Sequence, residues 1–401
     1  MKKNSFRLPL LITTTVLLFS FCSYPSLHAA KSYEPYRVSS HVSCRVSSDV
    51  SCRESDGFAV GSPANENVES HSTFIEDTTI VYTSCDTIKL AATLAIPHDS
   101  VSKHPAVILM SGTGQQDRDG TMAGHQMFRD ISNYLAERGI AVLRTDDRGT
   151  GHSTGDYSLA TTADFANDAL AAINYLKTRH DIDTHNIGLL GHSEGAATIS
   201  IAASQCDDVS FIISLCGLMT AGLPSVIQQN IDIVENSPIP EDHKPRYHDI
   251  NQQLFRTAYQ YALSDSLEQQ LYDVYDQWQK DTLNQNIRYS IYMYVMTATS
   301  PWYRFFIRYN PADYLEKVNI PVLIINAGKD ILVNARQNEE SARHCLRNNP
   351  DVTFRLFPDL NHLLLPCQYG TQEEYPSLAA VKTSQEVLQL LDSWIHEKLK
   401  P

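Results

Sequence analysis

The sequence is poor in positive charge and lacks the cysteine and histidine spacing of a metal site. Lys and Arg number 32 against 46 Asp and Glu, for a formal net charge of −14. Nucleic acids and anionic membrane surfaces repel such a chain, so this balance argues against both as partners. The eight cysteines form no C-x-x-C pair and no cluster with histidine at zinc spacing, so we expect no bound metal. Net charge alone does not identify a substrate.

Long apolar runs are absent beyond residue 30. Basic residues near the start of the chain precede an apolar run over 10–21, and small residues follow it. This pattern predicts a signal peptide over 1–30 that is cleaved near Ala29 or Ala30. The apolar run is short for a membrane span. We therefore expect an exported protein, periplasmic or secreted, without an integral membrane span.

The cysteines leave two questions open. A lipid anchor on Cys22 is the alternative to a cleaved leader, but the phenylalanine before it is a poor fit to the small residue that such a site requires. Export permits disulfides, and Cys44 and Cys52 could pair with each other or not at all. Cys206 and Cys216 flank an expected core strand, where we expect buried free thiols.

Strands and helices alternate from residue 72 onward. Residues 31–71 are rich in Ser, Asn and Glu without periodicity, which predicts a low-complexity linker. Buried-type apolar runs then alternate with helical patterns, as in a doubly wound, mostly parallel sheet. We expect this α/β core to comprise 72–217 and 318–401. Its expected strands are 73–82, 88–96, 106–110, 140–144, 186–190, 211–215, 321–325 and 352–357, and its expected helices are 125–137, a helix capped by Thr161, 335–346 and 384–398.

The alternation breaks over 218–317, where no strand is evident. The runs 264–280 and 287–299 are helical in pattern, so this segment is interpreted as a helical cap inserted into the sheet domain. Aromatic residues gather near its end. They either pack the cap onto the sheet or line an acyl pocket: Tyr292, Tyr294, Trp302, Tyr303, Phe305 and Phe306.

The most informative stretch is Gly191-His192-Ser193-Glu194-Gly195, between an apolar run and a small-residue helix pattern. A G-x-S-x-G sequence between a strand and a helix is the pattern of a nucleophile elbow, a sharp turn that exposes the serine hydroxyl. The turn is strained and leaves room only for glycine two positions on either side. The motif therefore makes Ser193 the candidate nucleophile.

A serine nucleophile needs a base and an acid that orients the base. Asp330 directly follows a buried strand, and His362 follows the next strand along the chain. The carboxyl ends of parallel strands share one edge of the sheet, so the order serine, aspartate, histidine predicts a triad. Asp330 as a helix N-cap and His362 as a structural loop histidine are the alternatives. His192 is expected to point away from the serine.

The oxyanion of an acyl-transfer reaction needs two N–H donors. One is expected to be the backbone of Glu194, the residue after the nucleophile. The other is expected in the glycine-rich loop after strand 106–110, at Thr113, with Gly112 as the second choice. A phosphate cradle is the alternative for this loop, but it lacks the Gly-Lys-Ser/Thr ending of a P-loop.

With these motifs in place, residues 73–399 resemble the α/β-hydrolase superfamily. The similarity is greatest to bacterial esterases and serine aminopeptidases (S33-like), whose members carry Gly-Ser-Gly-Pro-Gln-Asp-Arg-Asp in the oxyanion loop. Residues 112–119 read Gly-Thr-Gly-Gln-Gln-Asp-Arg-Asp, and 146–153, 191–195 and 361–362 also match. The resemblance implies the triad and no cofactor.

Two residues depart from the pattern of this branch, and three others have an expected structural role. Ser111 replaces a histidine that many relatives have, and Gln115 replaces the proline; both lie at the oxyanion loop. Asp117, Arg118 and Asp119 are expected to brace that loop by ion pairs.

We expect a serine hydrolase that cleaves small carboxylic esters. An aminopeptidase or dipeptidyl-peptidase acting on short peptides is the first alternative, and it would need carboxylates near Ser193 to bind the substrate ammonium. A catalytically silent binding protein on the same fold is the second. Nothing in the sequence indicates an oligomeric state. The candidate ammonium-binding residues of the cap are Glu235, Glu241, Asp265 and Glu268.

Overall fold

The computed structural model describes residues 73–84 and 87–400. The predicted signal peptide and linker, together with Cys22, Cys44 and Cys52, lie outside the described residues. No helix in the described part of the chain has both the length and the apolar character needed to cross a bilayer.

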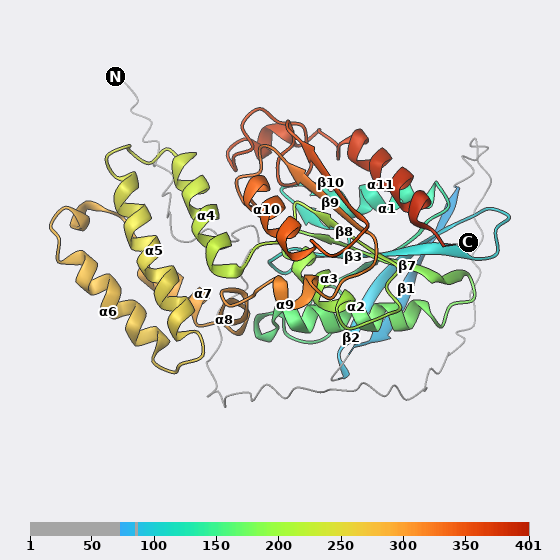
Figure 1. Ribbon diagram of the computed structural model, residues 1–401, viewed down its shortest axis with the longest axis horizontal. Coiled ribbons are helices and arrows are strands. Elements are labelled where there is room, and N and C mark those ends of the chain that lie inside the picture. Colours follow the sequence, from blue (N-terminus) through green and yellow to red (C-terminus); the bar gives the residue numbers. More distant parts are fainter. Residues whose placement is uncertain (1–72, 85–86, 401) are drawn as a thin grey trace, which may run out of the picture.

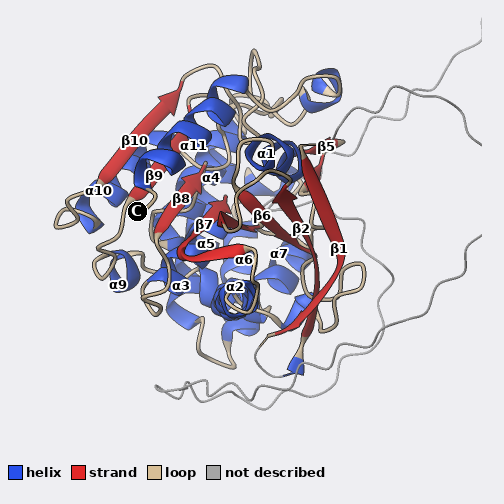
Figure 2. Ribbon diagram, turned by 90° about the vertical axis from the view of Figure 1, so that its right-hand side faces the viewer, coloured by secondary structure: helices blue, strands red, loops and turns tan. Residues whose placement is uncertain are grey.

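The core is a mixed sheet of eight strands in the order β1-β2-β6-β3-β7-β8-β9-β10 (Figure 2). Strand β2 runs antiparallel to both of its neighbours, and all other adjacent strands of this sheet are parallel. This topology confirms the predicted α/β-hydrolase fold. The strands are β1 (Phe74–Thr83), β2 (Lys89–Pro97), β3 (His104–Met110), β6 (Ala141–Thr145), β7 (Ile182–His192), β8 (Phe211–Leu215), β9 (Val322–Ala327) and β10 (Val352–Phe357).

Helices cover both faces of the sheet, which is why its central strands are apolar without alternation. In β3, Val107 and Leu109 pack in one core with α1 (Met127–Ala136) and α11 (Gln385–Lys398). Ala106 and Ile108 pack in a second core with α2 (Thr162–Leu176) and α3 (Gly195–Ala203). Figure 2 shows these helix pairs on opposite sides of the sheet.

The chain between β8 and β9 is helical, and its first four helices lie beside the sheet in Figure 1. Its apolar residues join the core that α2 and α3 form with the sheet. We call α4 to α8 the cap. The helices of this segment are α4 (Gly222–Glu235), α5 (Lys244–Tyr261), α6 (Leu267–Gln279), α7 (Ile291–Ala298), α8 (Pro301–Phe306) and α9 (Ala312–Leu315), and α10 (Ala335–Cys345) follows β9.

Helices α1, α6 and α7 are each at least three residues shorter than the sequence pattern predicts, and α6 begins at Leu267 instead of residue 264. Helix α1 begins at Met127 because His125 and Gln126 (β5) pair with Thr121 and Met122 (β4) in a small antiparallel hairpin. Helix α7 begins at Ile291. Before it, the buried Tyr289 donates its hydroxyl to Asn251 of α5 (Oη to Oδ1, 2.9 Å). A local hairpin before α1 and a contact with α5 before α7 thus override the helical pattern in these two places.

The prediction that Cys206 and Cys216 are buried free thiols is confirmed in full only for Cys216. Cys206 and Cys216 are both free thiols, as predicted. Cys216 is buried, whereas Cys206 is only partly buried because it lies in the exposed connection that follows α3.

Candidate active site

Ser193 lies in the sharp turn between β7 and α3, in a conformation that non-glycine residues rarely adopt (φ 56°). The turn is tight on both sides. A Cβ at position 191 would lie 2.2 Å from the carbonyl oxygen of Gly195, and a Cβ at position 195 would lie 2.3 Å from that of Met110. The Ser193 N–H donates to the Leu215 carbonyl of β8 (3.0 Å). The surrounding sheet therefore holds the strain that the elbow needs.

Asp330 and His362 come together from the ends of neighbouring strands β9 and β10. The two side chains are buried, and the His362 Nδ1 donates to Asp330 Oδ2 over 2.7 Å. The other carboxylate oxygen, Oδ1, accepts the N–H groups of Leu332 (2.8 Å) and Val333 (2.9 Å). These bonds fix the carboxylate and place the imidazole proton on Nδ1, which leaves Nε2 free to accept a proton.

Asp330 is not the N-cap of the helix that follows it, which was the alternative to a catalytic role. The N-cap of α10 is Asn334, whose side chain accepts the Gln337 N–H. Asp330 instead closes the loop after β9 and contacts His362. The assignment of catalytic roles to Ser193, Asp330 and His362 stays a prediction that rests on this geometry.

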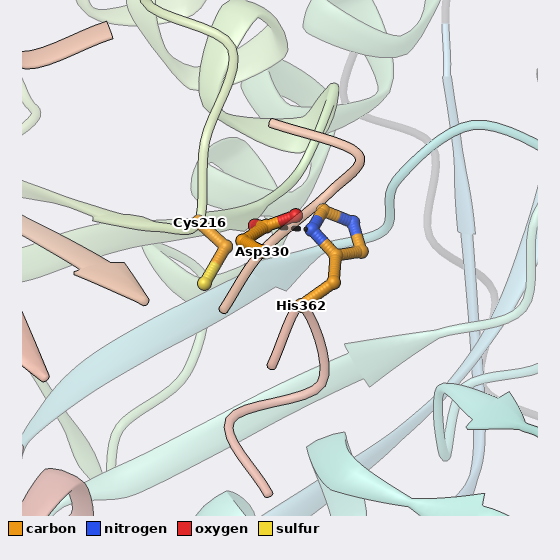
Figure 3. Close-up of side chains that lie close together, drawn as sticks. All are labelled: Cys216, Asp330 and His362. Carbon is orange, nitrogen blue, oxygen red and sulfur yellow. Dashed lines mark hydrogen bonds and ion pairs between the residues drawn. The ribbon is translucent and has the colours of Figure 1, made fainter. Parts of the chain in front are cut away.

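Cys216 completes a cluster of three buried side chains with Asp330 and His362 (Figure 3). Their donor atoms lie within 4.8 Å of one another, so sulfur, nitrogen and oxygen ligands for a metal ion are close together. However, burial and the neighbouring Asp330 raise the pKa of the Cys216 thiol well above its usual value. A protonated thiol is a poor ligand. The set is therefore better suited to hydrogen bonding around Asp330 than to holding a metal.

His192, next to the candidate nucleophile, supports the backbone of the His362 loop. Its Nε2 donates to the His362 carbonyl oxygen (2.9 Å), and the two ring centroids are 4.6 Å apart. Burial, together with the nearby His362, lowers the pKa of His192 to about 3. His192 is therefore neutral at ordinary pH. The motif alone contained no signal for this contact, which joins residues 170 positions apart.

The loop predicted to supply an oxyanion donor lies against the elbow. A Cβ at Gly112 would lie 2.9 Å from the Ser193 Cβ, so only glycine fits there without displacing the serine. The next residue, Thr113, donates its hydroxyl to the Glu194 carboxylate. The loop and the elbow are therefore in direct contact. The assignment of the backbone N–H groups of Thr113 and Glu194, or of Gly112, as oxyanion donors stays a prediction.

Ion pairs brace this loop at Arg118 and Asp119. Arg118 binds Asp146 with its backbone N–H and with a guanidinium bond of 2.6 Å, and Asp119 pairs with the buried Arg144 of β6. The Asp117 carboxylate accepts the backbone N–H of Asp119 and of Thr121 (both 3.0 Å). Arg118 and Asp119 thus make the ion pairs expected of them, whereas the contacts found for the Asp117 carboxylate in the described residues are backbone hydrogen bonds.

Ser111, which departs from the pattern of the resembled branch, binds a buried carboxylate. Its hydroxyl donates to Asp147 Oδ1 (2.6 Å), and the Gln116 N–H donates to Oδ2 (2.7 Å). Asp147 therefore joins the two ends of the loop. Burial raises the pKa of the Asp147 carboxyl to about 7, against the lowering effect of these two hydrogen bonds.

Replacing Asp147 by asparagine should change how stability depends on pH. An unfolded aspartate has a pKa near 4, so between about pH 4 and pH 7 the native state of the wild type binds more protons than the unfolded state. The stability that Asp147 contributes therefore falls as pH rises through this interval. Asparagine does not titrate, and it can still accept from Gln116 and donate to Ser111. Between pH 5 and pH 7.5, the wild type should lose about 2 kcal/mol of unfolding free energy relative to the variant.

Urea unfolding of both proteins at the two pH values measures this difference. Every other titrating group is common to the two chains, so the comparison isolates residue 147. Parallel pH profiles would contradict the prediction.

Some aromatic residues of the cap are buried in the core, and another, Trp302, binds a residue of the nucleophile elbow. Tyr294, Tyr303 and Phe306 are buried, whereas Tyr292 is exposed. The indole Nε1 of Trp302 donates to Glu194 (2.8 Å). The first interpretation, that the aromatics pack the cap onto the sheet, therefore describes the three buried residues, and the sequence held no signal that Trp302 contacts the elbow.

The four candidate ammonium-binding residues of the cap pair within the cap or are exposed. Glu235 and Glu241 both pair with Lys244, and Glu235 also accepts from His248. Asp265 and Glu268 are exposed. None of the contacts found for these carboxylates in the described chain involves Ser193.

Comparisons with known proteins agree with this architecture. The family described as X-Pro dipeptidyl-peptidase (S15 family) matches residues 86–349. Esterase EstD of Thermotoga maritima is 26% identical over 293 residues, which are 69% of this chain and 58% of EstD. An uncharacterized 31.7 kDa protein of Escherichia coli, from the traX-finO intergenic region, is 30% identical over 127 residues, 31% of this chain and 41% of that protein. The chain thus spans less than two thirds of either relative.

Solved structures of similar shape include two esterases. Est1E from Butyrivibrio proteoclasticus with bound ferulic acid has a TM-score of 0.45 and 18% identity, covering 79% of this chain and 98% of that chain. The Pyrococcus furiosus esterase Pf2001 has a TM-score of 0.49 and 15% identity, covering 83% and 96%.

Proposed function

The chain belongs to the X-Pro dipeptidyl-peptidase (S15) family, and from this premise we propose that it is a serine hydrolase that cleaves small carboxylic esters. One observation carries the proposal. A buried pair, Asp330 and His362, lies at the sheet edge where the strained turn of Ser193 is also found. The finer resemblance to the S33-like branch remains part of the proposal.

The proposed reaction follows the logic of a triad. His362 Nε2 takes the Ser193 proton as Oγ attacks the ester carbonyl, and Asp330 stabilises the imidazolium that forms. The backbone N–H groups of Glu194 and Thr113 stabilise the oxyanion. His362 then protonates the leaving alcohol. In the second half of the reaction it activates the water that hydrolyses the acyl-enzyme.

The hydrogen bonds of the Glu194 carboxylate support an ester rather than a peptide substrate. A dipeptidyl-peptidase must bind the ammonium group of its substrate, which requires an available carboxylate near the nucleophile. Glu194 is the acidic residue adjacent to Ser193, and its buried carboxylate already accepts hydrogen bonds from Thr113, Thr162 and Trp302. The name of EstD, an esterase, also supports this choice.

A panel of substrates tests the proposal. We expect the wild-type protein to hydrolyse short-chain p-nitrophenyl esters. It should turn over Gly-Pro-p-nitroanilide and alanine-p-nitroanilide no faster than a Ser193→Ala control. Initial rates measured side by side decide between the two classes. Turnover of the dipeptidyl anilide with no ester hydrolysis would contradict the ester proposal and favour the peptidase.

We also propose that the protein is exported after cleavage near Ala29 or Ala30. The basic start and the apolar run over 10–21 support this proposal. The mass of the mature N-terminus after expression in a bacterial host tests it.

A further inference from the structure

The Glu194 side chain joins three separate parts of the molecule. Thr113 of the oxyanion loop donates to Oε2, while Thr162 at the start of α2 (2.6 Å) and the Trp302 indole of α8 (2.8 Å) donate to Oε1. The carboxylate is buried, and burial raises its pKa despite these donors. A buried carboxylate is costly unless it is fully hydrogen-bonded. A buried carboxylate held by three donors directly after the candidate nucleophile therefore suggests a functional role in addition to packing.

Glu194 is connected to both predicted oxyanion donors, the backbone N–H groups of Glu194 and of Thr113. Its own N–H is the first donor, and Thr113, which its carboxylate holds, supplies the second. The loop is also held one residue later, where the Gly114 N–H donates to the Tyr157 hydroxyl (2.8 Å). Tyr157 belongs to a short 3₁₀ turn, Tyr157–Leu159, that packs against α8. The cap thus contacts the oxyanion loop through Trp302 and Glu194, and also through Tyr157.

We propose that Glu194 is a positioning residue that aligns the oxyanion hole and couples it to the docked position of α8 through Trp302. This inference rests on the proposed serine hydrolase function. It predicts that contacts in this network change the rate of the chemical step more than substrate binding, because the oxyanion forms only in the transition state. Loss of these contacts should lower kcat and leave KM nearly unchanged.

A matched pair of cap variants tests the coupling. Trp302→Phe keeps an aromatic ring and removes the indole N–H that binds Glu194. Trp278→Phe removes the same kind of bond elsewhere in the cap, from Nε1 to Asp249 Oδ2 (3.1 Å). For a short-chain ester we expect kcat to fall about tenfold in Trp302→Phe, with KM within about twofold, and to stay at the wild-type value in Trp278→Phe. Equal kcat values in the two variants would overturn the proposal.

Variants of Glu194 test the carboxylate itself. Glutamine can accept from Thr162 and Trp302 with its oxygen and donate to the Thr113 hydroxyl with its amide, so Glu194→Gln should keep kcat within about threefold. Glu194→Leu leaves all three donors without their acceptor and should lower kcat about 100-fold, the effect of losing an oxyanion donor. Wild-type kcat in Glu194→Leu, or a change confined to KM, would overturn the proposal.

Two further measurements keep the test decisive. Thermal unfolding identifies a Glu194→Leu protein that does not fold, in which case the tryptophan pair decides alone. The rate of labelling by a fluorophosphonate, whose phosphoryl oxygen also occupies the oxyanion hole, repeats the comparison without ester turnover. A wild-type protein that is labelled but hydrolyses no ester would contradict the ester proposal alone, and the ratios of labelling rates would still test Glu194. A wild type that neither turns over esters nor takes the label would overturn both.

Discussion

Replacing Ser193 by alanine should abolish ester hydrolysis and leave the protein folded. The substitution removes only Oγ, and alanine adopts the strained φ of 56° at a cost similar to that of serine. The N–H of residue 193 still bonds to the Leu215 carbonyl. Removing the nucleophile of a triad lowers kcat on the order of 10⁶-fold. Initial rates on a p-nitrophenyl ester, with thermal unfolding beside them, measure both parts of the expectation.

Ser200 offers a matched control for this substitution. It is a buried serine of α3, and its hydroxyl bonds to the Ala196 carbonyl (2.7 Å). Ser200→Ala removes the same atom from a serine seven positions later in the chain and should keep wild-type kcat. If Ser193→Ala retained the rate of Ser200→Ala, Ser193 would not be the nucleophile.

The second large effect is expected from Asp330→Asn. Oδ1 of Asp330 accepts two backbone N–H groups, from Leu332 and Val333, so the carbonyl oxygen of asparagine should take that position. Its amide then faces His362 Nδ1 and donates to it. The imidazole proton would then lie on Nε2. A protonated Nε2 cannot accept the proton of Ser193. A change of tautomer of this kind lowers kcat about 10⁴-fold.

Steady-state kinetics of Asp330→Asn and of a control aspartate test this expectation. Asp249 accepts the Trp278 indole N–H within the cap, so Asp249→Asn changes a hydrogen-bonded carboxylate far along the chain from the candidate triad. We expect Asp249→Asn to keep kcat within about twofold. A similar small effect in Asp330→Asn would mean that the carboxylate does not orient the base.

Much of the fold could be predicted because the signals are local. Strands buried on both faces are continuous apolar runs, and the carboxyl ends of parallel strands share one edge, so Asp330 after β9 and His362 after β10 had to be close in space. The capping box at Thr161 and Asp164 begins α2 as its sequence indicates. Local chemistry of this kind needs no knowledge of distant contacts.

The contacts that the sequence did not predict are tertiary. Glu194 was considered for its backbone N–H, yet its side chain binds Trp302, 108 residues later. Ser111 was noted as a departure from a family pattern, and its partner Asp147 comes 36 residues later. Isolated acidic residues in a sequence usually lie in solvent. Their burial depends on donors from other elements, which only the folded chain brings together.

Covalent labelling tests the central claim most directly. The wild-type protein is treated with a fluorophosphonate, digested, and the modified peptide is identified by tandem mass spectrometry. We predict a single adduct on Ser193 that forms in step with the loss of ester hydrolysis. An adduct on another residue that accompanies the same loss of activity, or complete loss of activity with Ser193 unmodified, would contradict it.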